Sequence, residues 1–314
     1  MKFYPLKFKP IYKEIIWGGN KLRNLFNKDF PADKKIGESW ELVDLPSDKS
    51  VIENGEFVGN TIGEVLQKYP HQILGQKSYQ PPFGLLIKFI DANDVLSVQV
   101  HPDSQAAKKL PNARAKTECW YIVNCTPDAC IYKGLKPGTT KQMFEKAVKD
   151  GSCAKLLNKV QVKKGQCHFL PAGTVHAIGA GNLIAEIQTP SDTTYRVFDW
   201  NRLQNGKPRQ LHIAEALESI HFNQDPKVLT VKDAGRLIDC DLFKVDKTTA
   251  KAGGSAKIAA GAVKVIIIIS GSGKITSPDA EPVDFSIGQT LLLPAEFNGE
   301  FIFSSETICL SSTF

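Results

Sequence analysis

The segment of residues 165–176 constrains the fold of this chain more than any other feature of the sequence. It has the spacing G-x5-P-x-G-x2-H and ends in His176. Glycine supplies backbone conformations that other residues avoid, and proline fixes its own φ angle, so this spacing predicts a tight turn. The turn aims the histidine at its end into the interior of a β structure. We therefore predict that residues 165–176 form a strand that closes on a buried histidine.

Two segments upstream predict strands that carry further polar side chains. Residues 95–101 alternate strictly between apolar and polar positions, which is the period of a half-buried strand. Gln99 and His101 therefore project from the same face. Glu118 leads into a second strand pattern, Cys-Trp-Tyr-Ile-Val. Together with His176, these side chains form a set that could hold one metal ion.

The donor set favours a metal without redox chemistry. Imidazole nitrogens and one carboxylate suit zinc, iron, cobalt or nickel, and a glutamine amide oxygen adds a neutral donor. The seven cysteines contain no C-x-x-C pair, which disfavours a thiolate site. In an iron oxygenase, Gln99 would fill a position that oxygen needs. We expect one zinc ion per chain. The remaining histidines are interpreted as ordinary polar residues: His71, His168, His212 and His221.

Short strand patterns that are separated by Gly and Pro residues dominate the chain. They predict a mainly β fold with a few packing helices. Helical spacing occurs in residues 60–68, in residues 139–159 with an interruption at Gly151, and in residues 210–220. The spacing G-x5-P recurs at residues 288–294, but residues 222–314 contain no histidine. We therefore predict a catalytic metal-binding barrel over residues 1–222 and a degenerate C-terminal barrel without a metal site over residues 223–314.

The composition argues against several classes of function. A chain with 42% hydrophobic and 23% charged residues is typical of a soluble globular protein. The apolar run 265–269 is far too short to span a bilayer, and no secretory signal is apparent, so we expect a cytoplasmic protein without membrane association. The net charge of +6 is spread along the chain, which disfavours nucleic acid but would help to attract a small anionic substrate.

Two lysines extend the predicted site. Lys116 is two positions from Glu118, so both side chains point into the same space. Lys88 lies in the otherwise apolar segment 85–90, where an unpaired ammonium would be costly.

Three charged residues follow His176 and could also reach the metal. They are Glu186, Asp192 and Arg196. The last two would share a face if residues 192–196 are extended. The alternative is a surface strand with an ordinary Asp–Arg pair.

Six motifs, in this order, resemble the type I mannose-6-phosphate isomerases of the cupin superfamily, in particular their shorter bacterial form. They span roughly residues 5–205, and the histidine-containing segment 165–176 also resembles the second signature of the cupin barrels. The motifs are Trp17-Gly-Gly, Gly37-Glu-Ser-Trp-Glu41, Leu96-Ser-Val-Gln-Val-His-Pro-Asp103, Lys116-Thr-Glu118, Gly173-Thr-Val-His176 and Ser191-Asp-Thr-Thr-Tyr-Arg196.

The resemblance implies a fold of two jelly-roll barrels and a zinc enzyme that interconverts mannose 6-phosphate and fructose 6-phosphate. It maps the zinc ligands onto Gln99, His101, Glu118 and His176 and a catalytic arginine onto Arg196. The family's active-site lysines correspond to Lys88 and Lys116, its acidic residues to Glu186 and Asp192, and Trp17 is expected beside the substrate with Lys88. The expected partner is a small sugar phosphate, and the chain is expected to be a monomer or homodimer.

The chemistry of aldose–ketose exchange agrees with these residues, because a proton moves between two carbons while no electrons leave the substrate. The base could be Lys116, Glu186 or Asp192, and Arg196 suits either a phosphate or a developing oxyanion. Two other classes use the same barrel. An iron dioxygenase would consume oxygen, and a non-catalytic sugar-binding protein would fail a coupled isomerase assay.

Overall fold

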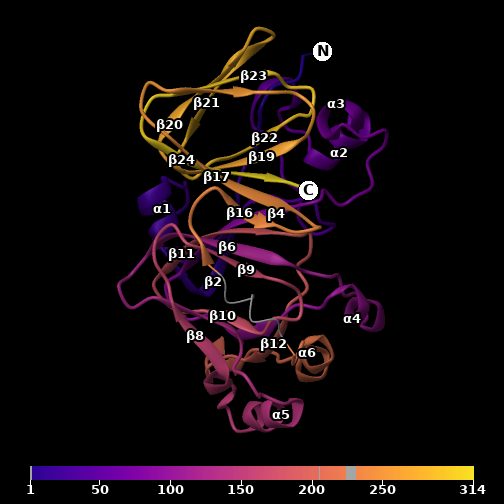
Figure 1. The fold of residues 1–314 in the computed structure, drawn as a ribbon, viewed down its shortest axis with the longest axis vertical. Helices are drawn as coiled ribbons and strands as arrows, with labels where there is room; N and C mark the ends of the chain where they lie inside the picture. Colours follow the sequence, from indigo (N-terminus) through magenta and orange to yellow (C-terminus); the bar gives the residue numbers. More distant parts are fainter. Residues whose placement is uncertain (1, 205, 224–230) are drawn as a thin grey trace.

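Four β-sheets lie in successive layers along the long axis of the molecule (Figure 1). The computed structural model describes residues 2–204, 206–223 and 231–314. With 42% of the residues in strands and 15% in helices, the prediction of a mainly β fold with few helices is confirmed.

The two sheets that enclose the predicted metal ligands form the lower half of Figure 1. The five-stranded sheet has the order β12 (Tyr195–Phe198), β5 (Val98–Val100), β10 (His176–Ile178), β7 (Cys130–Leu135), β8 (Leu157–Gln161). The seven-stranded sheet has the order β15 (Val231–Lys232), β9 (Cys167–Leu170), β6 (Glu118–Cys125), β11 (Asn182–Gln188), β4 (Leu86–Ala92), β3 (Ile36–Leu42), β2 (Ile11–Gly19).

The other two sheets form the C-terminal lobe. The six-stranded sheet has the order β1 (Leu6–Lys7), β22 (Thr290–Leu293), β19 (Lys264–Ser270), β24 (Thr307–Thr313), β17 (Lys244–Ala250), β16 (Arg236–Asp239). The four-stranded sheet has the order β18 (Ser255–Ile258), β23 (Gly299–Phe303), β20 (Ser272–Ser277), β21 (Ala280–Ser286). The strands β13 (Leu203–Gln204) and β14 (Lys207–Pro208) pair antiparallel as a separate two-stranded sheet.

The seven-stranded sheet is buried on both faces, because it lies between the five-stranded and the six-stranded sheets. Every residue of β4 and β11 is buried. Side chains alternate along these strands: Phe89 belongs to the apolar cluster shared with the C-terminal lobe, whereas Ile90 belongs to the cluster inside the N-terminal lobe. Lys88 and Glu186 lie directly opposite each other, in phase with the interior positions. The strand period therefore directs both charges into the N-terminal barrel.

The predicted helices are present but shorter than their sequence patterns. They correspond to α2 (Ile62–Lys68), α5 (Lys141–Lys149) with the 3-10 helix η2 (Cys153–Leu156), and α6 (Ile213–Ser219). Thr61 and Glu64 form a capping box at the start of α2. Gly151, at a φ of +75°, separates α5 from η2. The other helices are α1 (Lys21–Phe26), α3 (Pro70–Leu74), α4 (Ser104–Lys109) and the 3-10 helix η1 (Gly55–Phe57).

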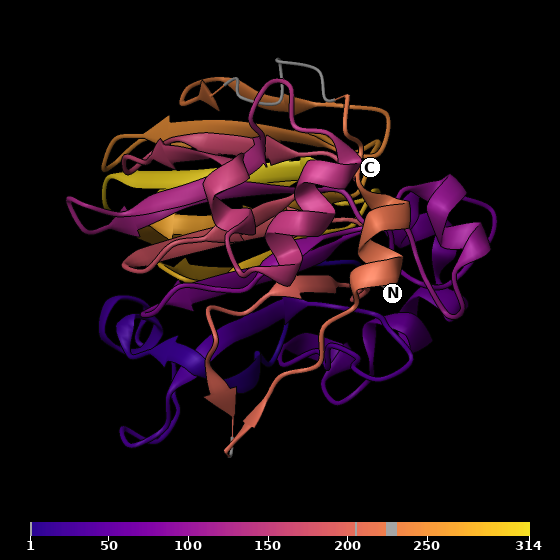
Figure 2. The ribbon, with the colours of Figure 1, turned by 90° about the horizontal axis from the view of Figure 1, so that it is seen from below.

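Helices α5 and α6 cover the outer face of the five-stranded sheet (Figure 2). Phe144 of α5 and Ala216 of α6 are fully buried there, in one cluster with Val98 and Val197 of the sheet. This packing makes the sheet a rigid support for the polar side chains on its inner face. Among the described residues, no helix has the length and apolar character needed to cross a membrane.

The prediction of one strand over residues 165–176 is wrong. The segment forms two strands, β9 and β10, which belong to facing sheets. Gly173 between them has a φ of +82°, and Thr174 donates a backbone hydrogen bond to Pro171 at 3.2 Å. The turn therefore carries the chain across the barrel instead of ending one strand. As a result, His168 and His176 lie on opposite walls.

The two lobes exchange strands at both ends of the N-terminal region. Leu6 of β1 pairs with Leu292 in the six-stranded sheet, and Val231 of β15 pairs with His168 in the seven-stranded sheet. The segment that joins the lobes includes residues 224–230, which lie outside the described residues. The predicted division into residues 1–222 and 223–314 stays a prediction.

Candidate active site

The strand register brings three of the four predicted metal ligands together. Gln99 on β5 lies directly opposite His176 on β10, and His101 follows one residue after β5 ends. Glu118 begins β6 in the facing sheet. One ligand atom from each of His101, Glu118 and His176 lies within 4.8 Å of the others, and all three side chains are buried.

Backbone carbonyls orient both histidines. The Nδ1 atom of His101 lies 2.9 Å from the carbonyl oxygen of Thr193, and that of His176 lies 2.8 Å from the carbonyl oxygen of Thr174. An Nδ1–H that donates to a carbonyl leaves the lone pair of Nε2 available to a metal ion. Each Nε2 atom lies 3.4 Å from a different carboxylate oxygen of Glu118.

The electrostatics of the cluster keep its ligands in the form that binds metal. Burial, followed by the charge of Lys116, lowers the pKa of His101 to about 3. Burial also lowers the pKa of His176. For Glu118, burial opposes ionisation, but Lys116 and the two histidines outweigh it and hold the pKa well below 4.5. Two neutral imidazoles therefore face one carboxylate.

Gln99 flanks this cluster. Its Nε2 atom lies 3.3 Å from Nε2 of His176, and its Oε1 atom accepts a hydrogen bond from Ser97 at 3.3 Å. The amide oxygen would have to turn towards the histidines to become a ligand, which a rotation about the last side-chain bond achieves.

The residues present fit a metal ion. Among the described residues, Nε2 of His101 and Oε1 of Glu118 are buried without a hydrogen-bond partner, and buried polar atoms of this kind are expensive unless something binds them. Lone pairs on nitrogen and oxygen that converge on one point repel each other without a cation. Imidazole and carboxylate donors suit a divalent transition metal, zinc included.

A layer of alternating charges surrounds the cluster. Nζ of Lys116 lies 2.9 Å from Oε2 of Glu118 and 3.8 Å from Oε1 of Glu186. Glu186 accepts a hydrogen bond from the indole of Trp120 at 3.0 Å. Burial and the charge of Glu118 raise the pKa of Glu186 to about 7, although Lys116 and Lys88 oppose this shift. A carboxyl group with such a pKa can exchange a proton near neutrality.

Lys88 is not left unpaired, although it lies in an apolar strand. Its Nζ atom is 3.4 Å from Glu38 and 3.8 Å from Glu186, and it lies 4.5 Å from the ring centre of Trp40. Burial opposes the ionisation of Glu38, but the charge of Lys88 and the indole of Trp40 outweigh it and lower the pKa. These charges compensate one another inside the barrel.

Arg196 stands in the same cross-strand row as two metal-ligand candidates. It lies opposite Gln99, which lies opposite His176. Its Nε atom donates to the hydroxyl of Ser97 at 3.2 Å, and Nη1 donates to the carbonyl of Gln210 at 2.9 Å. The guanidinium is thus half-buried and fixed at both ends.

The structure does not bring Asp192 into this group. The segment becomes a strand only at Tyr195, and Asp192 is exposed. No ion pair joins Asp192 to Arg196 among the described residues, so the alternative of a simple surface pair is not what the structure shows either.

Trp17 is buried in the apolar cluster inside the barrel, which also contains Trp120. The ring of Trp120 meets His176 edge-on at 5.2 Å. A Cβ atom at Gly37 would lie 2.6 Å from the Trp17 ring, which explains why the Gly37-Glu-Ser-Trp-Glu41 motif begins with glycine. Trp17 therefore packs against the backbone of Gly37 inside the N-terminal lobe.

Two residues near the site were missed by the sequence analysis. Glu38 sits in a quoted motif, and Ser97 shares the alternating face of Gln99, so the motif could have pointed to the first and the same-face rule to the second. Neither residue belongs to the set of metal ligands that the sequence predicts. Glu38 contacts Lys88 and Ser97 contacts Arg196, and these contacts exist only in the folded structure.

Lys133 is a further buried charge, opposite His176 on β7. Its side chain is fully buried, and no described residue accepts a hydrogen bond from its Nζ atom. His168 is equally buried, and neither ring nitrogen has a hydrogen-bond partner in the described part of the chain. Both groups lie inside the same lobe without a role in the metal cluster.

Replacement of Lys133 by methionine should stabilise the fold by about 1–3 kcal/mol, because the buried ammonium is lost and the unbranched chain still fills its space. Burial lowers the pKa of Lys133 to about 8. The destabilisation of the fold by the buried ammonium is therefore fully present below pH 8 and disappears as the pH rises towards 10.5, the ordinary pKa of lysine. The gain in urea midpoint should shrink over that range. Lys149→Met on the exposed side of α5 is the control, and a less stable Lys133→Met protein would contradict the prediction.

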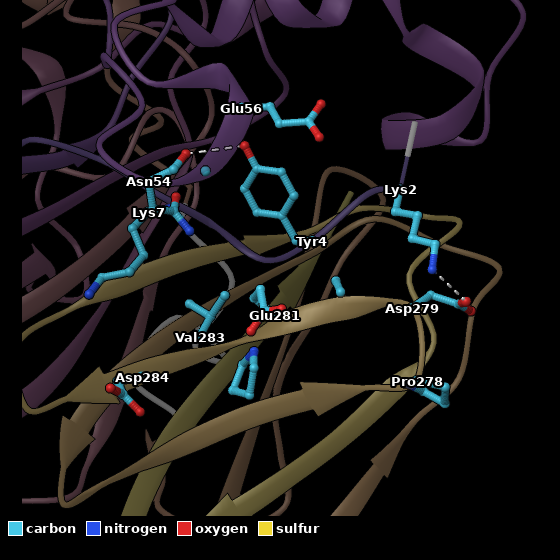
Figure 3. Close-up of a pocket in the computed structure, with 13 residues that line it drawn as sticks. Lys2, Tyr4, Lys7, Asn54, Glu56, Pro278, Asp279, Glu281, Val283 and Asp284 are labelled. Carbon is cyan, nitrogen blue, oxygen red and sulfur yellow. Dashed lines mark hydrogen bonds and ion pairs between the residues drawn. The ribbon is translucent and has the colours of Figure 1, made fainter.

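A pocket of about 840 Å³ on the other side of the molecule lies between the N-terminal segment and the strand β21 (Figure 3). Tyr4 donates to the carbonyl of Asn54 there, and Lys2 pairs with Asp279 at 3.4 Å. None of the predicted site residues lines it. Its lining contains no histidine or cysteine, so it offers no set of metal ligands comparable to the buried cluster.

Comparison with known proteins finds relatives over nearly the whole chain. Residues 6–128 match the family described as phosphomannose isomerase type I, catalytic domain. The chain is 38% identical over 308 residues to a probable mannose-6-phosphate isomerase, GmuF, of Bacillus subtilis, covering 95% of each chain. It is 37% identical to the mannose-6-phosphate isomerase ManA of the same organism, covering 98% of each.

A crystal structure of the mannose 6-phosphate isomerase from Bacillus subtilis superposes with a TM-score of 0.87 at 30% identity, covering 98% of this chain and 99% of that one. The two sequence relatives from Bacillus subtilis named above cover at least 95% of this chain at 37–38% identity. The chain therefore belongs to the type I mannose-6-phosphate isomerase family.

Proposed function

We propose that this protein catalyses the reversible isomerisation of mannose 6-phosphate and fructose 6-phosphate. The observation that carries the proposal is the buried cluster of His101, Glu118 and His176 with Arg196 in the adjoining row, in a chain of this family. We propose that one zinc ion is held by these three ligands and Gln99. When bound, such an ion supplies Lewis-acid stabilisation to negative charge on the substrate oxygens.

The reaction moves one proton and no net electrons. A base removes the proton from C2 of the aldose while O1 gains a proton, which gives a cis-enediol. The hydroxyl at C2 then loses its proton, and C1 gains one, which gives the ketose. Every atom returns to the sugar apart from protons that exchange with the base.

The chain offers groups for each of these tasks. Lys116, Glu186 and Asp192 remain the candidates for the base. The burial of Glu186 between two lysines favours it over the exposed Asp192. Arg196, with its planar fork of donors, would bind the developing oxyanion or the phosphate.

Other residues would bind and orient the sugar. Lys88 supplies a cation inside the barrel, and Trp17 supplies part of its wall. We further propose that the C-terminal lobe is a scaffold without a metal site. Its six-stranded sheet packs against the back of the seven-stranded sheet through a shared apolar cluster, so it would hold that sheet in shape.

Incubation with mannose 6-phosphate in D2O, followed by NMR, tests this function. We expect deuterium at C2 of the aldose and C1 of the ketose, because the enediol exchanges its proton with the base. Chelator-treated protein is the control and should exchange neither. Absence of both turnover and deuterium incorporation in the metal-loaded protein would contradict the proposal, whereas turnover without deuterium would mean either that a shielded base returns the same proton or that a hydride shifts directly.

A further inference from the structure

A pocket on the outer face of the five-stranded sheet is separate from the metal centre. It has a volume of about 700 Å³, which is within the usual size of small-molecule sites. Its lining comes from β7, from the segment η2–β8 and from the end of β12. Tyr132 on β7 belongs to the outer cluster, whereas the adjacent Lys133 lies opposite His176 on the inner side. We propose that this pocket binds a phosphorylated sugar as a second site.

Three aromatic rings form one wall of the pocket. The ring centre of Trp200 lies 5.6 Å from that of Tyr132 and 5.3 Å from that of Phe198. The ring planes are inclined at 47° and 59°, so the three rings do not form a flat stack. A flat base can lie parallel to only one of these rings. A saturated sugar ring, whose C–H groups project in several directions, can contact more than one.

The wall is held in place before any ligand arrives. Trp200 has a φ of +54°, in the left-handed region that residues other than glycine seldom adopt. Its indole nitrogen donates to the carbonyl oxygen of Leu96 at 2.7 Å. Conformations of this kind persist where the surrounding structure fixes them, and they gather at binding sites. The hydrogen bond therefore fixes the ring at the edge of the pocket.

The side chains that line the pocket carry positive charge only, although the carboxylate of Asp150 beside it interacts with Lys155. Lys136, Lys155 and Lys159 line it, and no aspartate or glutamate does. All three lysines are exposed, and none forms an ion pair within the described part of the chain. Free ammonium groups that surround an apolar wall attract an anion. Lysine binds phosphate as a compact point charge.

The aromatic wall and the lysines together specify the ligand. An apolar ring face alone would suit many molecules, and lysines alone would suit any anion. A sugar that carries one phosphate satisfies both, because its C–H face packs on the inclined rings while the phosphate reaches the ammonium groups. The chemistry that this pocket recognises is a phosphate monoester on a sugar ring.

Titration with glucose 6-phosphate, monitored by NMR of the Trp200 indole N–H, tests the proposal on the metal-loaded protein. Loss of the signal in Trp200→Phe assigns it. The signal should shift with saturation in the wild type, and the double variant Lys155→Gln/Lys159→Gln should bind about tenfold more weakly or worse. The matched control is Lys146→Gln/Lys149→Gln, which removes the same charge from the neighbouring helix and should bind as the wild type does.

A second set of titrations distinguishes binding at this pocket from binding at the catalytic site, and a sugar phosphate from other ligands. Arg196→Ala should leave the shift of the Trp200 signal unchanged, because Arg196 is not among the lining residues. Inorganic phosphate should bind at least about tenfold more weakly than glucose 6-phosphate, since it has no ring to pack on the wall. An unmoved Trp200 signal, equal binding by the Lys155/Lys159 variant, or a response to adenosine 5′-monophosphate without one to glucose 6-phosphate would each overturn the proposal.

Discussion

Chelation should reduce isomerase activity by about 10³-fold or more, and zinc should restore it. The expected size follows from the several kcal/mol by which a metal ion stabilises transition-state charge, at about 1.4 kcal/mol for each factor of ten. The cations near the cluster include Lys116, which is engaged with Glu118 at 2.9 Å, and Lys133, which lies opposite His176 on β7. An ammonium group has no vacant coordination position, so these lysines cannot replace the Lewis acid.

The variant His176→Ala should have the same effect without a chelator. His176 contributes an Nε2 atom that is fixed by the carbonyl of Thr174, so its loss removes a preoriented ligand. Elemental analysis should find little zinc in this variant, whereas circular dichroism should show a folded protein, because most apolar clusters lie outside the metal cavity. The control is His71→Ala, which removes an exposed histidine from α3. Full zinc occupancy in His176→Ala would exclude this residue from the ligands.

Much of this site can be predicted from the local periodicity of the sequence. Alternation in residues 95–101 predicts that Gln99 and His101 share a face, and the glycine and proline spacing predicts a turn before His176. Both inferences use only the two-residue period of strands and the special conformations of two residue types. The structure brings His101 and His176 together with Glu118 from a facing sheet.

What the period cannot predict is which sheet a strand joins. Residues 165–176 form one continuous pattern in the sequence, yet Gly173 turns the chain from one wall of the barrel to the other. His168 and His176 therefore differ in their surroundings although they belong to the same pattern. The pairing of β1 with the C-terminal lobe cannot be predicted from the local pattern either, because it depends on contacts between residues far apart in sequence.

The residues that support the site are the least predictable. Ser97 and Gln210 bind the two ends of the Arg196 guanidinium, although one is a small hydroxyl and the other acts through its backbone. Glu38 pairs with Lys88 from a strand fifty residues earlier. Such contacts follow from tertiary packing, and no local pattern encodes them.

Arg196→Ala should keep zinc and the fold but lower activity by about 10²–10⁴-fold, the range expected for one lost electrostatic donor in a transition state. Arg196→Lys should restore little, because a point charge cannot reproduce two donors held by Ser97 and Gln210. Ser97→Ala leaves the guanidinium in place but removes one of its anchors, so a smaller loss of about tenfold is expected. Arg236→Ala, in the exposed part of the C-terminal lobe, is the charge-matched control.

The kinetic constants distinguish the two roles that Arg196 could have. A guanidinium that stabilises the enediolate acts only when charge develops, so its loss should lower kcat with little change in KM. A guanidinium that holds the phosphate binds ground state and transition state alike, so its loss should raise KM alone. The position of Arg196 next to Gln99 and in one row with His176 favours the first outcome, because it places the guanidinium beside the metal-ligand candidates. Wild-type kcat and KM in Arg196→Ala would remove the residue from the active site altogether.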